Sequence, residues 1–477
     1  MAISHYFYLF FVFLIGFIGA CGSDDELTES QSDPAPIEHH VLYENRLQDV
    51  NEDESVVEVH LTAGWADIEV ADGLTLPMMT YNGMFPGPLL EANVGDRVIV
   101  HFTNNLQEPT TVHWHGLRIA DRMDGTPRVQ EPVPPGGTFR YEFRVPDSGT
   151  YWYHPHIRSD EQIERGLYGP IIIRDPAEPQ VDAERIIIVD DILLNTSNSD
   201  LEPFSAARFG MHGRMGNLLL SNGRANSTSA EHDPVKFGAV ERWRIINTSN
   251  ARTFVLSVDG AADSKMIGTD GGPVSPQDFE WLLVPNGQRY DVLVTHGVYE
   301  TAQLTAHLPT LNESNEVVQT PVPIYRVDVE RADGTTPRRV IWPDKDRSEF
   351  ADRLIDREVR IVLTGYATDT GIVWTINGRQ NSMEPLFTFE RGETVLITIA
   401  NEAGPEHPFH LHGQFFEIVP DGRYWTEQPG LKDVVLVPGN TELKIRAYFD
   451  NPGQWMAHCH ILEHAALGMM SEIIVTE

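Results

Sequence analysis

The sequence predicts an all-β protein built from three Greek-key β-sandwich or barrel domains. From about residue 56 onward, short runs of β-branched and aromatic residues alternate with Gly, Pro, Asn and Asp, which is typical of strands separated by turns. No long amphipathic helical pattern interrupts these runs. An internal repeat near both ends of the chain then indicates the number of domains. The expected strands are Arg97–Phe102, Phe139–Val145, Ile171–Ile173, Arg185–Val189, Trp243–Ile246, Tyr290–Val294, Val359–Leu363, Val395–Ile399 and Leu443–Tyr448.

Length and charge limit the classes of protein to consider. A chain of 477 residues is long enough for several domains, because one domain usually takes roughly 100 to 200 residues. Lys and Arg total 35 against 70 Asp and Glu, a net charge of -35. Such a surface repels a phosphate backbone, so we expect no nucleic-acid partner.

The first segment is typical of an export signal. Tyr6 to Ala20 form an apolar run that is shorter than the roughly 20 residues of a membrane-spanning helix. It ends in Ile-Gly-Ala-Cys21, which resembles the bacterial lipobox, although no Lys or Arg precedes the run. We therefore expect a signal peptide over 1–21, a flexible tether over 22–50 and a protein of the cell envelope that contacts the membrane only through lipid on Cys21. A plain cleaved signal with an incidental Cys is the alternative.

The chain has only two cysteines, Cys21 and Cys459. If Cys21 carries lipid, Cys459 has no partner for a disulfide within the mature chain. A lone thiol in an oxidising compartment calls for another role, and metal ligation is one.

An internal repeat relates the two ends of the folded chain. The segment Gly95–Asn104 matches Gly392–Asn401, and a His-x-His pair begins 18 positions after each glycine, at His113 and His410. A Gly likewise precedes each of the later pairs by five positions. We therefore expect domain 1 over 51–177 and domain 3 over 346–477 to be copies of one another. Between them, 178–345 forms domain 2, a copy without such pairs.

Four His-x-His pairs form the main chemical signal, although a single pair is usually a surface or core feature. For 19 His in 477 residues, chance predicts roughly one such spacing. Residues two apart on a strand project to the same side, so each pair can direct two imidazoles into one cavity. The pairs are His113/His115, His154/His156, His410/His412 and His458/His460.

The ligand types favour copper over zinc. Zinc takes four ligands at most in structural sites, which would leave most of these imidazoles unused. Cys459 is followed five residues later by His464 and ten residues later by Met469, and His407 lies upstream. Two His, one Cys and a weak axial Met are the ligands of a blue-copper electron-transfer site. Met470 competes with Met469 for the axial position, and the spacing favours Met469.

These motifs resemble those of the multicopper oxidases over nearly the whole mature chain. The quoted segments are HWHG from His113, HPH from His154, HPFHLHG from His407, HCHILEHAALGM from His458, Thr269–Gly272 and Leu283–Tyr290. The resemblance implies three cupredoxin-like domains and four copper ions. The implied type 1 ligands are His407, Cys459, His464 and Met469; the type 2 ligands are His113 and His410; the type 3 ligands are His115, His154, His156, His412, His458 and His460.

The same resemblance implies an oxidase that couples one-electron oxidation of phenolic or aromatic donors to reduction of dioxygen to water. A metallo-oxidase of cuprous, ferrous or manganous ion is the close alternative. A copper-free envelope scaffold is disfavoured because every expected ligand position is filled. Copper nitrite reductases are disfavoured because they normally carry two domains and an incomplete type 3 set.

Proton delivery and cuprous-ion binding involve further residues. Asp124 matches an acidic position that the family uses to relay protons, with a turn residue as the equal alternative. Related bacterial enzymes carry Glu-Asp where this chain has Ala465 and Ala466, and Glu463 is the candidate substitute. Soft ligands for cuprous ion occur in one loop, although packing is the favoured interpretation for this set, Met211, His212 and Met215.

Overall fold

The computed structural model describes residues 41–225, 234–297, 299–311, 316–330, 339–345, 350, 352–382 and 384–477. The predicted signal peptide, Cys21 and most of the tether lie outside these ranges. Strands dominate the described chain, which confirms the predicted all-β class. None of the helices within these ranges combines the length and hydropathy of a membrane span. The short helical segments are η1 (Asp121–Met123), α1 (Ser159–Gln162), α2 (Ala206–Phe209) and α3 (Leu462–Ala466).

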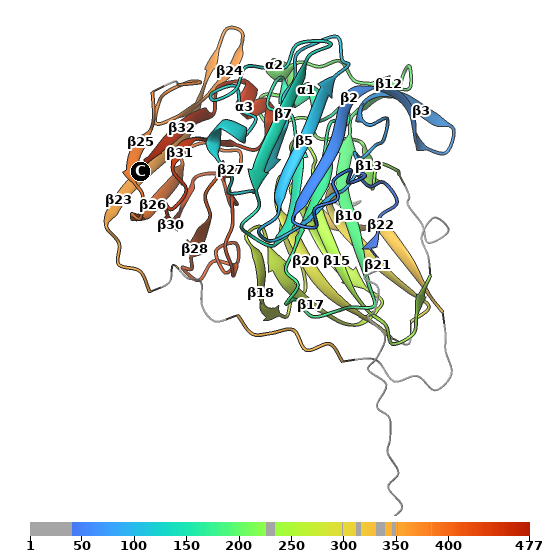
Figure 1. Cartoon of the computed structure of the whole chain (residues 1–477). Helices are drawn as coiled ribbons and strands as arrows, with labels where there is room; N and C mark the ends of the chain where they lie inside the picture. Colours follow the sequence, from blue (N-terminus) through green and yellow to red (C-terminus); the bar gives the residue numbers. More distant parts are fainter. Residues whose placement is uncertain are drawn as a thin grey trace, which may run out of the picture. The chain divides into compact units, whose positions relative to one another are not determined.

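Two four-stranded sheets form the first sandwich (Figure 1). Their facing sides pack a single apolar core that contains Val100, Trp114 and Tyr141. One sheet has the order β3 (Leu74–Tyr81), β2 (Val56–Ala71), β5 (Arg97–Asn104), β7 (Thr138–Arg144). The other has the order β4 (Leu90–Asn93), β9 (Gly169–Arg174), β8 (Gly149–His154), β6 (His113–His115).

The third sandwich repeats this arrangement with two five-stranded sheets. Its core contains Trp374, Ile397, Phe409 and Cys459. One sheet has the order β24 (Gly371–Ile376), β23 (Arg357–Thr368), β26 (Thr394–Asn401), β30 (Thr441–Tyr448), β28 (Phe416–Val419). The other has the order β25 (Phe387–Glu390), β32 (Met470–Thr476), β31 (Gly453–Cys459), β27 (His407–Leu411), β29 (Val434–Val437).

The second sandwich lies between them in sequence and has its own core around Trp243 and Leu256. Its larger sheet has the order β1 (Val41–Leu42), β10 (Ala183–Ile192), β15 (Val240–Asn247), β20 (Arg289–His296), β17 (Ala261–Thr269), β18 (Gly272–Gln277), with β13 (Leu218–Ser221) beside β10. Its smaller sheet has the order β14 (Val235–Lys236), β22 (Val317–Glu330), β21 (Thr301–Leu311), β16 (Phe254–Asp259), β19 (Leu282–Val284). A ribbon of β11 (Leu194–Asn195) and β12 (Asp200–Leu201) completes it.

One asparagine marks the internal repeat in all three sandwiches. Strands β5, β15 and β26 each pair in parallel with an earlier strand and antiparallel with a later one. Each ends in a buried Asn, namely Asn104, Asn247 or Asn401. In every copy the amide nitrogen donates to two backbone carbonyls and the amide oxygen accepts from the backbone two residues on. An unbonded buried amide is costly, so this side chain fixes the turn that follows the strand.

The first and second sandwiches are joined by apolar and ionic contacts. Trp152 and Ile172 of the first share a buried cluster with Ile186 and Ile246 of the second. Fully buried arginines lie in the second sandwich, and Arg244 reaches Thr150 Oγ1 of the first at 2.9 Å. The first and second sandwiches therefore share a buried interface.

Candidate metal centres

The strand register brings the His-x-His pairs together. Strand β6 pairs antiparallel with β8, which places His113 opposite His154. Strand β27 pairs with β31 in the same way, which places His410 opposite His458. Because alternate residues project to one side of a strand, each sandwich directs two adjacent pairs toward the same place.

Imidazoles from the first and third sandwiches meet in one buried group, which we call the eight-histidine cluster. The rings of His115 and His410 stack with centroids 3.9 Å apart, and those of His113 and His412 lie 4.1 Å apart. Both contacts join one sandwich to the other, and every member is buried. The members are His113, His115, His154, His156, His410, His412, His458 and His460.

Hydrogen bonds behind the rings turn the other nitrogens inward. His113 Nδ1 lies 2.8 Å from the Asp124 carbonyl, and His410 Nδ1 lies 2.8 Å from the Asp433 carbonyl. A carbonyl can only accept, so Nδ1 carries the proton in each case and the Nε2 lone pair is free. His458 Nδ1 bonds the Cys459 carbonyl in the same way.

The inward nitrogens fit metal ions. His412 Nε2 and His458 Nε2 are 3.0 Å apart, and His458 Nε2 carries a lone pair because its Nδ1 holds the proton. Among the described residues, nothing bonds the buried Nε2 atoms of His113, His410 and His460. Buried nitrogens without partners are costly, and a shared cation satisfies them. Groups with all ligand atoms within 4.8 Å of one another are His113/His115/His154, His113/His410/His412 and His156/His412/His458.

Burial keeps these imidazoles in the form that binds metal. It lowers the pKa of His115, His154, His412 and His460 well below the usual value, and neighbouring imidazoles lower it further. Burial also lowers the pKa of His458 to about 4. Neutral imidazole is the ligand form of histidine, so the cluster can bind cations at neutral pH without first losing protons.

Two buried carboxylates contact the cluster. Asp124 follows η1, and its Oδ2 lies 2.9 Å from His412 Nδ1 while its Oδ1 lies 3.2 Å from His113 Nδ1. Asp433 Oδ1 lies 3.2 Å from His115 Nε2. Asp124 therefore both ends a turn and contacts two of the candidate ligands.

The second sandwich also reaches the cluster, through Arg289. Its Nη1 and Nη2 donate to the two oxygens of Asp433 at 2.7 and 2.6 Å, and its Nε donates to the Thr150 carbonyl at 2.9 Å. Asn286 donates to the carbonyl of His460. Asn286 and Arg289 lie in the segment Leu283–Tyr290, which resembled the family but was given no role, and Asp433 carried no sequence signal.

A separate buried site lies where β31 ends. Cys459 Sγ is 3.5 Å from His407 Nδ1 and 3.6 Å from His464 Nδ1, and the two nitrogens are 3.0 Å apart. Burial raises the pKa of the Cys459 thiol and lowers the pKa of His407 to about 3. A thiolate held here therefore needs a cation, which fits a soft metal bound by sulfur and two neutral imidazoles.

One aromatic side chain, Trp374, and one thioether, Met469, lie in the same core as the site of Cys459. The Trp374 ring lies 4.9 Å from the His407 ring and 4.5 Å from the His464 ring. Met469 is fully buried in the same core cluster as Cys459, whereas Met470 is only partly buried. The core position favours Met469 over Met470 as the fourth group.

The loop Gly210–Gly216 of the second sandwich covers His464. Burial lowers the pKa of His464 well below its usual value, and the backbone of Met211 opposes this shift. Gly210 accepts from Trp374 Nε1 at 2.7 Å. Met211 and Met215 are 49% and 44% exposed, so neither residue is packed in the core.

Glu463 lies on α3 and anchors the same loop. Its Oε2 accepts from Arg214 N at 3.0 Å, and its Oε1 accepts from Asn250 Nδ2 at 3.1 Å. Burial raises the pKa of Glu463 to about 7. The contacts give it a structural role between the second and third sandwiches, beside Ala465 and Ala466 of the same helix.

A cupredoxin-like fold in which one strand, β31, carries both the thiol of Cys459 and the cluster member His458 is typical of a copper-dependent oxidoreductase. Comparison with known proteins agrees. Models of the multicopper oxidase family match 62–178, 184–303 and 356–477. The chain belongs to the multicopper oxidase family, which confirms the resemblance and the enzyme class inferred from sequence.

Individual relatives cover most of the chain. Multicopper oxidase MmcO of Mycobacterium tuberculosis is 33% identical, with 84% of this chain and 84% of the relative covered. Laccase-2 of Botryotinia fuckeliana is 30% identical, with 87% and 82% covered. The crystal structure of Lac15 from a marine microbial metagenome is 33% identical with a TM-score of 0.70, and 88% of this chain and 100% of that chain are covered.

Proposed function

We propose that this protein is a laccase-like oxidase that takes single electrons from phenolic or aromatic donors and delivers them to dioxygen, which is reduced to water. The observation that carries the proposal is the position of Cys459. Its neighbours in the chain, His458 and His460, both belong to the eight-histidine cluster. The thiolate site is therefore joined to the cluster by a few covalent bonds.

The proposed metal complement is four copper ions. His407, Cys459, His464 and Met469 would hold the type 1 ion. The type 2 ion would lie between His113 and His410, and the type 3 pair between His115, His154, His156, His412, His458 and His460. When bound, copper supplies one-electron redox chemistry. The protein positions the ligands, excludes water through burial and keeps the imidazoles neutral.

We further propose that Asp124 moves protons for oxygen reduction. Its carboxylate contacts the outer nitrogens of His412 and His113, so it lies one imidazole away from the space between the ligands. General acid–base groups must lie within such reach of the reacting atoms or of a water beside them.

Oxidation of cuprous or another metal ion is the second candidate activity. The exposed thioethers of Met211 and Met215, on the loop that covers His464, support it because thioethers suit cuprous ion. The sequence alone favoured packing for this loop, and the exposure of both side chains corrects that expectation.

Oxygen uptake by the copper-loaded protein tests both activities. We expect uptake with 2,6-dimethoxyphenol to exceed uptake with cuprous ion under identical conditions. Met211→Leu keeps the size of the side chain and removes the thioether, so a selective loss of uptake with cuprous ion would instead support the metallo-oxidase. If the fully loaded protein consumes no oxygen with either donor, the oxidase proposal is wrong.

The axial position gives a separate prediction. Met469→Leu should raise the reduction potential of the type 1 site, because it removes a weak thioether ligand that stabilises the oxidised ion. Met470→Leu is the matched control and should leave the potential unchanged. A redox titration of the blue absorption band measures both, and a shift in the control alone would assign the ligand to Met470.

Export with lipid on Cys21 remains our proposal for localisation. Cys21→Ala should move the protein from the membrane fraction to the soluble fraction of the envelope. Retention in the membrane fraction would contradict the anchor.

A further inference from the structure

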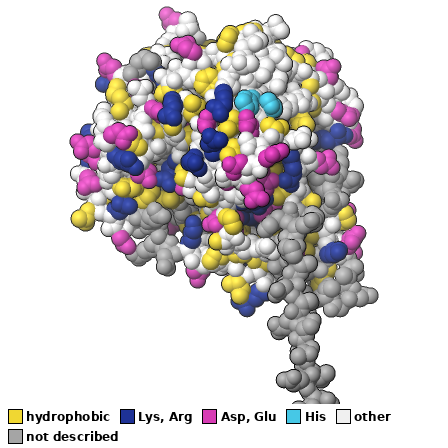
Figure 2. All heavy atoms as spheres, viewed as in Figure 1, with side chains coloured by type: hydrophobic (Ala, Val, Ile, Leu, Met, Phe, Trp, Pro, Cys, Tyr) yellow, Lys and Arg dark blue, Asp and Glu magenta, His cyan; other side chains and the backbone are white. Residues whose placement is uncertain are grey.

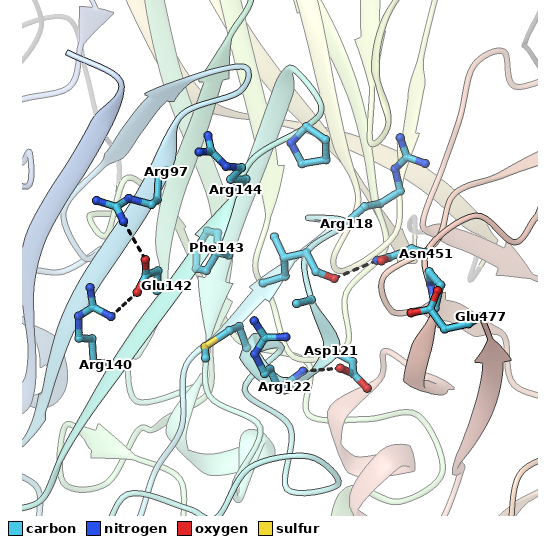
Figure 3. Close-up of a pocket in the computed structure, with 15 residues that line it drawn as sticks. Arg97, Arg118, Asp121, Arg122, Arg140, Glu142, Phe143, Arg144, Asn451 and Glu477 are labelled. Atoms are coloured by element: carbon cyan, nitrogen blue, oxygen red, sulfur yellow. Dashed lines mark hydrogen bonds and ion pairs between the residues drawn. The ribbon is translucent and has the colours of Figure 1, made fainter. Parts of the chain in front are cut away.

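A surface cavity of about 850 Å³ lies between strands β5 and β7, helix η1 and the turn before β31. We call it the arginine pocket, because arginine is the residue type that recurs in its lining (Figure 3). None of the predicted metal ligands lines it. The arginines are Arg97, Arg118, Arg122, Arg140 and Arg144.

The charge of this lining contrasts with that of the whole chain. The sequence has twice as many acidic as basic residues, yet five arginines and only three acidic residues line the pocket. Figure 2 shows Lys and Arg side chains gathered over β7 on this face. A concave site with positive charge concentrates anions even on an acidic protein.

The carboxylates of the pocket are already engaged. Glu142 bonds two arginines: its Oε1 lies 3.1 Å from Arg97 Nη1, and its Oε2 accepts from Arg140 Nη1. Asp121 Oδ1 accepts from its neighbour's backbone, and its Oδ2 accepts from Gln454 N at 3.0 Å. Glu477 lies 3.7 Å from Arg391. These groups therefore do not neutralise every guanidinium.

Two of the arginines keep donors available. Among the described residues, no group pairs with the Arg122 guanidinium, and Arg144 uses only one nitrogen, which donates to the Gly95 carbonyl at 2.9 Å. Arg118 differs, because Asp147 and Asp450 hold it. A guanidinium has five donors in a planar fork that suits oxyanions, so Arg122 and Arg144 have donors for a ligand.

The pocket also has apolar surface. Ile119, Met123 and Phe143 contribute to the lining between the charged side chains. In the close-up, Arg144 and Arg122 lie on opposite sides of the pocket, and Phe143 lies between them (Figure 3). An apolar floor with a guanidinium on each of two sides matches a ligand that has an apolar body and an acidic group at each of two ends.

We propose that the arginine pocket binds a small organic anion that carries two acidic groups on an apolar body. One acidic group bonds the guanidinium of Arg122 and the other that of Arg144. The apolar body lies against Ile119, Met123 and Phe143. None of the proposed type 1 ligands, His407, Cys459, His464 and Met469, lines this site.

Isothermal titration calorimetry tests the proposal on the copper-loaded full chain. The probe is benzene-1,3-disulfonate, which has two anionic groups on one ring. We expect saturable binding that weakens with added salt, because the contacts are charged and exposed. Benzenesulfonate, with one anionic group, should bind about 10-fold more weakly, the size of one lost charge-assisted contact.

Two double variants distinguish binding by the arginines of the pocket from a general effect of the protein's net charge. Arg122→Gln with Arg144→Gln should weaken binding of the disulfonate by at least about 10-fold. Arg326→Gln with Arg379→Gln removes the same charge from exposed arginines elsewhere and should leave binding unchanged. Equal binding by the two double variants, or no saturable binding by the parent protein, would overturn the proposal.

Discussion

Cys459→Ser should abolish oxidase turnover while the protein stays folded. The thiol lies 3.5 and 3.6 Å from two imidazole nitrogens, and a hydroxyl there is a poor ligand for copper. We expect turnover to fall at least about 1000-fold, which corresponds to roughly 4 kcal/mol of barrier. The blue absorption band should disappear with it, and circular dichroism should be unchanged because serine is nearly the same size.

Cys21→Ser is the matched control, since Cys21 is the only other cysteine of the chain. It should keep both the colour and the turnover. If Cys459→Ser retained the blue band or full turnover, the assignment of the thiolate site would be wrong. Copper analysis of both variants shows whether the eight-histidine cluster is still loaded.

Asp124→Asn should slow oxygen reduction without removing the cluster. The amide oxygen can still accept from His412, so the rings keep their positions, but the side chain no longer takes up a proton. General acid–base groups contribute about 100-fold or more, and we expect a loss of about that size in turnover. The dependence of the remaining rate on pH should also change.

Asp121→Asn provides the control for lost charge in the same turn. Asp121 belongs to η1 and bonds backbone groups, and no contact joins its side chain to the histidines among the described residues. Its substitution should leave turnover within a factor of about two, as for a surface change. Equal losses in the two variants would show that charge in the turn, rather than proton transfer at Asp124, explains the effect.

Much of the fold and the clustering of the histidines were predictable because both follow from periodic patterns. The repeat that ends in Asn104 and Asn401 identified equivalent strands, and the two-residue spacing of the histidines put them on one face. The pairing of Asp433 with Arg289 was not predictable. They are 144 positions apart, and only the docking of the second sandwich against the third brings them together.

The contact between the loop Gly210–Gly216 and His464 was also not predictable from the sequence. The loop around Met211 comes from another sandwich, and its sequence carries no strand or helix periodicity that would place it. The exposure of a thioether depends on which neighbours happen to pack against it, so a local pattern cannot reveal it.

Because the eight-histidine cluster is divided between two sandwiches, its complete set of ligands exists only late in the synthesis of the chain. A nascent or truncated polypeptide that ends before β27 contains only four members of the cluster, His113, His115, His154 and His156. Arg289 is then without Asp433, the carboxylate that it holds in the finished protein. Because a ligand that binds only the completed form shifts the equilibrium toward it, bound metal would favour complete chains over fragments. A complete metal complement would thus report whether synthesis and docking of all three parts have finished.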